Sequence, residues 1–107
     1  MVVDRITEFV KMLETLEIPV AYFSFKKGPG LPFLTYEITG RDDLIADNYN
    51  YHKIIDIRVE LYTDKPFTGV ERKLETLLEE NELDYSWSQF FVESEKVWQT
   101  IYEMRLL

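Results

Sequence analysis

The stretch HKIIDIRVELYTD, residues 52–64, decides the architecture of the chain. Ile55, Ile57, Val59 and Leu61 fall on one parity, and the positions between them are charged. This period-two pattern predicts a strand with one buried and one wet face, and β-branched residues suit the buried side. No other part of the sequence alternates over so many residues, so we expect a long strand at or near the centre of a sheet.

Upstream of this strand the sequence predicts one helix and two strands. Apolar residues recur at helical spacing near the N-terminus and predict a helix that runs to about Glu17. Residues 20–25 and 32–39 predict two strands, and the glycine- and proline-containing segment 26–31 predicts a plain hairpin connection between them. The first three strands are therefore expected to form an antiparallel meander.

Gly40–Tyr51 is the longest segment without periodicity. We expect a loop here, because unstructured segments of about 12 residues are uncommon and often functional. Either it contacts a partner or it folds back and places its apolar residues on its own sheet. Its aspartates and asparagines offer oxygen atoms, but their spacing does not match a calcium-binding loop, so we assign no metal site.

Downstream, Thr68 and Glu71 have the spacing of a capping box and open a second helix that should end near Asn81. Its many glutamates are expected to lie on a solvated face, which disfavours acid–base catalysis by them. Residues 85–92 and 96–106 then predict a closing hairpin.

The predicted order is thus α-β-β-β-α-β-β. Each helix has one apolar stripe, so both should cover the same face of one mainly antiparallel sheet of about five strands. We expect a two-layer α+β fold in a single domain, residues 1–107. The opposite sheet face, which carries Asp56, Arg58, Glu60 and Tyr62, would be open to water or to a partner.

Composition excludes several classes of function. The chain contains no cysteine, so it has neither disulfides nor a thiolate nucleophile, and its formal net charge of −8 disfavours general binding to phosphate backbones. No apolar run approaches the roughly 20 residues of a membrane span, and we expect a soluble, unexported chain. Aromatic residues make up 15% of the sequence, and they either fill a sheet-rich core or mark a protein interface.

No motif predicts catalysis. His52 is the only histidine, and the sequence lacks a nucleophile elbow, a phosphate-binding glycine loop and a zinc-protease helix. We therefore predict no catalytic, cofactor-binding or metal-binding residues, no small-molecule substrate and no enzyme. A carboxylate-based hydrolase would need two of Glu37, Asp56 and Glu60 to converge in a pocket.

Several short segments, distributed over nearly the whole chain, resemble small tail-completion proteins of tailed phages and prophages of Gram-positive bacteria. The segments are 18–22 (IPVAY), 46–48 (ADN), 51–54 (YHKI), 59–64 (VELYTD), 71–75 (ERKLE), 93–96 (ESEK) and 102–103 (YE). None is a chemical motif, so the resemblance rests on their order and spacing.

The resemblance implies a structural virion protein of the tail-terminator or head–tail joining type. Such proteins form a ring, typically a hexamer, that caps the tail tube and contacts the head connector. The implied location is the virion, and the host cytoplasm during assembly. DNA would pass through the ring without specific binding, because an acidic lumen repels its backbone.

A ring needs a heterologous interface, in which one patch of a subunit meets a different patch of the next. We predict that the contacts come from the Gly40–Tyr51 segment and from an exposed strand edge with its aromatic residues. The candidate residues are Leu44, Ile45, Asp47, Asn48, Tyr49, Tyr51 and Tyr62. The alternative is a small acidic, non-enzymatic module or regulator that binds another protein.

Overall fold

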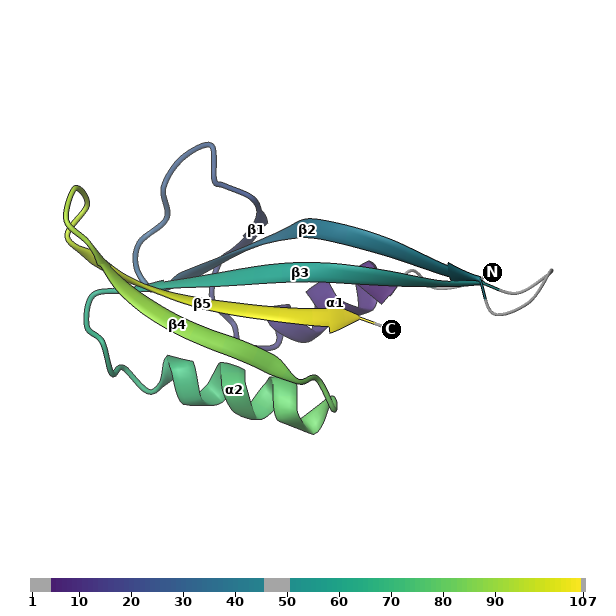
Figure 1. Ribbon diagram of the computed structural model, residues 1–107. Coiled ribbons are helices and arrows are strands. Elements are labelled where there is room, and N and C mark those ends of the chain that lie inside the picture. Colours follow the sequence, from purple (N-terminus) through teal and green to yellow (C-terminus); the bar gives the residue numbers. More distant parts are fainter. Residues whose placement is uncertain (1–4, 46–50, 107) are drawn as a thin grey trace.

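The computed structural model describes residues 5–45 and 51–106 and contains two helices and one five-stranded sheet with the strand order β1-β2-β3-β5-β4 (Figure 1). The elements are α1 (Arg5–Glu14), β1 (Val20–Tyr22), β2 (Phe33–Ile45), β3 (Tyr51–Thr63), α2 (Val70–Glu80), β4 (Tyr85–Val92) and β5 (Val97–Leu106). The predicted α+β class and element order are confirmed.

Strand β3 is the centre of the sheet, as its alternation predicts. It pairs antiparallel with β2 on one side and with β5 on the other. Ile57, Val59 and Leu61 are each no more than 1% exposed and form the middle of the core. A strand with neighbours on both sides and one covered face buries every second side chain, which accounts for its period of two.

Both helices pack on the same face of the sheet, as predicted. Phe9 and Leu13 from α1 and Leu74 and Leu78 from α2 join the strand residues in one buried cluster. In Figure 1, α1 is seen behind the strands of the sheet and α2 runs below β4. The core therefore lies between the sheet and this helical layer.

The expected antiparallel meander is wrong for the first strand, because β1 pairs with β2 in parallel, with Val20 opposite Leu34. Residues 23–32 are not a tight hairpin turn; they carry the chain back to the end of the sheet where β1 began. Phe23, with φ of 66°, redirects the chain just after the strand. Parallel neighbours require such a crossover, which local turn residues do not reveal.

The ends of the two helices differ in detail from the expectation. α1 stops at Glu14, and the turn to Glu17 continues with bonds between residues three apart, which is typical of a tightened last turn. At α2 the Glu71 carboxylate accepts a hydrogen bond from the Thr68 N–H at 3.0 Å. The Thr68 hydroxyl accepts a hydrogen bond from the N–H of Val70 and not, as a capping box requires, from the N–H of Glu71. Only one of the two hydrogen bonds of the predicted capping box therefore forms.

The predicted loop between Gly40 and Tyr51 is largely strand. β2 continues to Ile45 and β3 begins at Tyr51, and the two pair along their whole length apart from a register shift between Ile38 and Gly40. The hydrogen bonds between the two backbones hold such a two-stranded ribbon together, and they form with any type of side chain. Because a ribbon without a covering layer has no buried face, its sequence need not alternate. The predicted closing hairpin of β4 and β5 is confirmed.

Candidate functional site

The outer part of the β2–β3 hairpin projects beyond the rest of the sheet, and we call its described residues, 40–45 and 51–54, the arm. Pairing of β5 with β3 ends at the pair Ile55 and Leu106, and pairing of β1 with β2 ends at Tyr36. Figure 1 shows the hairpin extending past the end of β5. The molecule measures 51 × 25 × 25 Å, and this projection gives it its length.

Within residues 5–45 and 51–106, no strand pairs with the outer edges of the arm. An isolated two-stranded ribbon is marginally stable in water. An edge to which no described strand is paired can accept a strand of another chain. The arm is therefore the part of this fold best suited to contact another chain.

Three of the predicted interface residues lie on the arm. Leu44 is paired with His52, and Ile45 is paired with Tyr51. Asp47, Asn48 and Tyr49 lie outside the described residues. The backbone thus brings Leu44, Ile45 and Tyr51 to one end of the molecule.

Tyr62 lies at the other end of the same hairpin, where it is paired with Phe33. Their rings stack at a centroid distance of 4.8 Å. At roughly 3.3 Å per residue, Tyr62 is about 35 Å along the strand from Tyr51. Because of this separation, Tyr62 and the arm would contact different neighbouring proteins if both belong to interfaces.

The sheet face opposite the helices carries a polar network around Glu60. Its carboxylate accepts a short hydrogen bond from Gln99 Nε2, and Thr35 Oγ1 lies 3.5 Å from Glu60 Oε2. Gln99 also donates to the Tyr62 hydroxyl at 3.0 Å. Burial, with a contribution from the negative charge of Glu37, raises the pKa of Glu60 above its ordinary value of 4.5. The side chains around Glu60 are therefore hydrogen-bonded to one another and less exposed to water than the sequence predicts.

The raised pKa of Glu60 predicts a pH-dependent stability. The native state binds the proton of Glu60 more tightly than the unfolded chain, so this residue's contribution to the free energy of unfolding falls as pH rises from 4.5 through the folded pKa. The variant Glu60→Gln is expected to melt at a higher temperature than the parent at neutral pH. Below pH 4.5, where the parent carboxyl is also neutral, this difference should shrink.

The measurement is thermal unfolding at both pH values, with the variant Glu80→Gln on the exposed face of α2 as the control. That control removes the same charge without touching the network. Equal shifts for the two variants would show that net charge, and not the environment of Glu60, causes the change.

Most described aromatic residues are at least partly exposed; Phe9 and Tyr102 are the buried ones. Several lie along the two lateral edges of the sheet. Tyr22 and Phe23 are 51% and 65% exposed beside β1, and Trp87 and Phe90 are 54% and 53% exposed on β4. Of the two explanations for the aromatic excess, an interface role fits these side chains better than a core role.

Carboxylates suited to catalysis do not converge. Asp56 is paired with Arg105 at 2.8 Å, whereas the Glu37 carboxylate lies 3.5 Å from Arg58. Two cavities measure about 530 and 570 Å³, and neither is lined by two of Glu37, Asp56 and Glu60. In the described part of the chain, no cluster of three side chains is suited to a metal ion. Neither described helix is long and apolar enough to cross a membrane.

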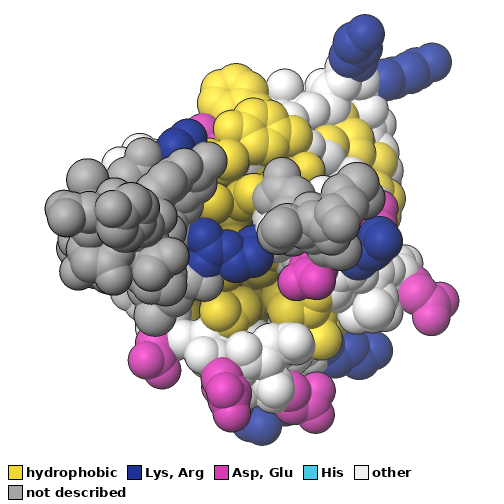
Figure 2. Space-filling model, turned by 90° about the vertical axis from the view of Figure 1, so that its right-hand side faces the viewer, with side chains coloured by type: hydrophobic (Ala, Val, Ile, Leu, Met, Phe, Trp, Pro, Cys, Tyr) yellow, Lys and Arg dark blue, Asp and Glu magenta, His cyan; other side chains and the backbone are white. Residues whose placement is uncertain are grey.

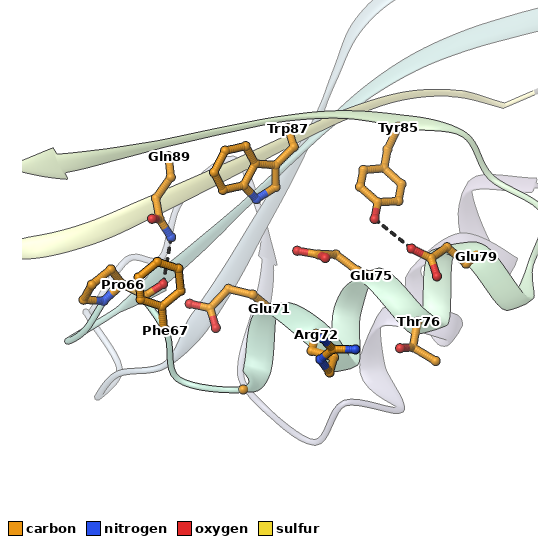
Figure 3. A pocket seen from close by; sticks show the side chains of 11 residues that line it. Pro66, Phe67, Glu71, Arg72, Glu75, Thr76, Glu79, Tyr85, Trp87 and Gln89 are labelled. Atoms are coloured by element: carbon orange, nitrogen blue, oxygen red, sulfur yellow. Dashed lines mark hydrogen bonds between the residues drawn. The ribbon is translucent and has the colours of Figure 1, made fainter.

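The cavity of about 530 Å³ is a groove between α2 and β4. Glu71, Glu75 and Glu79 line its helix side, and Trp87 and Tyr85 line its strand side (Figure 3). The prediction that the glutamates of α2 lie on a solvated face is wrong for Glu71, because this residue is only 9% exposed. The sequence does contain a signal for this arrangement, because a spacing of four residues places the three glutamates on one side of the helix.

Charged side chains are unevenly distributed over the molecule. In Figure 2, viewed toward the end of the arm, basic side chains project alone at the top, whereas acidic and basic side chains both lie in the lower half. Figure 1 draws the β1–β2 connection at the top and α2 at the bottom. The basic side chains at the top can attract acidic side chains of another copy even though the chain carries a net charge of −8.

The sequence matches no model of a known family and no curated protein. In structure, the chain resembles a chain of the virion of a native gene transfer agent particle, with a TM-score of 0.53 and 13% sequence identity over 87% of this chain and 81% of that one. At this level of identity the likeness shows a shared fold.

Proposed function

We propose that this chain is a structural, single-domain protein of a phage-like virion that assembles as a ring, typically a hexamer. The fold shared with a virion chain of a gene transfer agent particle carries the proposal. The short segments that resemble tail-completion proteins point the same way and suggest a position at the head-proximal end of the tail. The neighbours would be the tail tube protein and the head connector, and the chain would reach the virion from the host cytoplasm.

The positions of the arm and of the exposed aromatic residues support a structural, non-catalytic role. The arm projects from the sheet with free edges, and exposed aromatic residues lie at both lateral edges. These features suit contacts to neighbours on several sides, as a ring subunit needs. In such a ring the acidic surface would face the passing DNA and repel its phosphates, so DNA would slide through without specific binding.

The test is the mass of the purified chain in solution over a wide concentration range, measured by light scattering after size exclusion. We expect a discrete ring-sized species or one that grows in with concentration. A monomer would then be mixed with assembled tail tubes and examined by electron microscopy for a ring at the tube end. A chain that stays monomeric and leaves the tubes bare would contradict the proposal and favour a protein-binding module of another kind.

A further inference from the structure

The groove between α2 and β4 has the features of a receptor for a positively charged side chain. Glu71, Glu75 and Glu79 follow one another at intervals of one helical turn and point from α2 toward β4 (Figure 3). Trp87 stands opposite them, and Phe67 closes one end of the groove and is 86% exposed. Carboxylates beside exposed aromatic rings are the chemistry that binds lysine or arginine.

The three carboxylates are each held in place through one oxygen atom. Glu75 Oε2 accepts a hydrogen bond from the Tyr102 hydroxyl at 2.7 Å, and Glu79 Oε2 accepts one from the Tyr85 hydroxyl at 2.9 Å. Burial and the bond to Glu79 raise the pKa of Tyr85 to about 12, so this hydroxyl keeps its proton and remains a donor. The row of carboxylates is thus oriented before any partner arrives.

One carboxylate oxygen of Glu71 has no hydrogen-bond partner among the described residues. Its Oε1 is bonded to the N–H and the hydroxyl of Thr68 at 3.0 and 2.8 Å. Its Oε2 is buried without a hydrogen-bond partner, in a residue that lines the groove and is only 9% exposed. Buried acceptors in native proteins are nearly always paired with a protein group or an ordered water molecule, so Glu71 Oε2 is open to one further donor.

The same chain carries a matching pair of cations. Lys26 and Lys27 are exposed on the connection between β1 and β2. Neither makes a hydrogen bond or an ion pair with any other described residue. β1 is one edge of the sheet and β4 is the other, so the two lysines and the groove lie toward opposite sides of the molecule. Two complementary patches on opposite sides of a subunit are what a head-to-tail contact requires.

We propose that the α2–β4 groove of one copy receives Lys26 and Lys27 of the next copy. The lysine ammonium groups would lie between the carboxylates of α2 and the ring of Trp87, and one of them would donate to Glu71 Oε2. Arg72 also lines the groove, but Figure 3 shows its side chain on the side of the helix away from Trp87. This inference rests on the proposed function, because it specifies one contact of the self-assembled ring.

The experiment uses two charge reversals that are complementary to each other. Lys26→Glu with Lys27→Glu changes the exposed connection, and Glu75→Lys with Glu79→Lys changes the groove. Each variant alone should associate roughly tenfold more weakly or worse, because like charges then meet at the contact. An equal mixture of the two should assemble again, since every loop then finds a groove of opposite charge. Light scattering gives the mass in each case.

A control with the same change in net charge as the Lys26→Glu, Lys27→Glu variant separates local from global effects. Lys11→Glu with Lys73→Glu alters two exposed lysines that line neither patch, and it should assemble like the parent. Carbodiimide cross-linking of the parent tests the contact without any substitution, because it joins a lysine amine directly to a nearby carboxylate. In a mixture of isotopically heavy and light chains, the cross-links between Lys26 or Lys27 and Glu75 or Glu79 should include pairs of one heavy and one light chain, which can form only between copies.

The possible results separate this inference from the proposed function. A ring that survives both charge reversals, or that yields no such cross-link between chains, overturns the groove contact and leaves the virion role standing. Variants that are folded but fail to assemble when mixed also overturn it, and assign the groove to a different protein. A parent chain that never self-associates, even on tail tubes, overturns the ring and this contact together.

Discussion

A chain whose arm has been removed is expected to remain folded and to lose assembly. Replacing residues 43–53 by Asn-Gly connects Asp42 to Ile54 through a two-residue turn. These two residues are already paired in the β2–β3 ladder. Asn-Gly favours the turn that closes a two-residue hairpin. The described core residues all lie outside positions 43–53, so the melting temperature should change little. Association should weaken roughly tenfold or more, because a few contact residues carry most of an interface's energy.

Light scattering and thermal unfolding of the shortened chain are the two measurements. The matched control applies the same turn to the other hairpin, by replacing residues 93–96 with Asn-Gly between the paired Val92 and Val97. This control should assemble as the parent does. A shortened chain that still forms a full ring would show that the arm points away from the neighbouring subunits, and it would direct attention to the lateral edges of the sheet.

Leu61→Ala is expected to cause a large loss of stability. Leu61 is fully buried in the central strand, where it lies opposite Leu34 on one side and Thr100 on the other. Truncating such a side chain leaves a cavity and costs about 2–5 kcal/mol. A domain of this kind has a free energy of unfolding of about 5–15 kcal/mol in total, so a large share would be lost.

Urea unfolding measures this effect as a lower midpoint with an unchanged slope. Phe67→Ala is the control, because Phe67 is also a large apolar residue but is 86% exposed. Its substitution should change the free energy of unfolding by no more than about 0.5 kcal/mol. Similar losses for the two variants would contradict the position of Leu61 in the core.

The sequence allowed correct prediction wherever a pattern reports burial directly. The alternation from Ile55 to Leu61 identified the central strand, and the apolar stripes of both helices identified the covered face of the sheet. These patterns are reliable because a side chain facing the core must be apolar whatever its distant neighbours are.

The prediction failed where the backbone alone supports the structure. The arm contains aspartates and a glycine and does not alternate, yet its two strands pair through their N–H and C=O groups. The parallel pairing of β1 was hidden for a related reason, because the direction of a strand depends on where the connection 23–32 returns. Neither feature leaves a signature in the types of side chain.

The candidate contact surfaces divide in the same way. From the sequence alone we predicted a contact element around Leu44, Ile45 and Tyr51, and the sequence also shows the acidic character of the chain and its excess of aromatic residues. Only the tertiary structure placed Tyr62 at the opposite end of the hairpin and turned three glutamates toward β4. Periodicity records whether a residue is covered, whereas the partner that covers it comes from a distant part of the chain and is decided by how the layers pack.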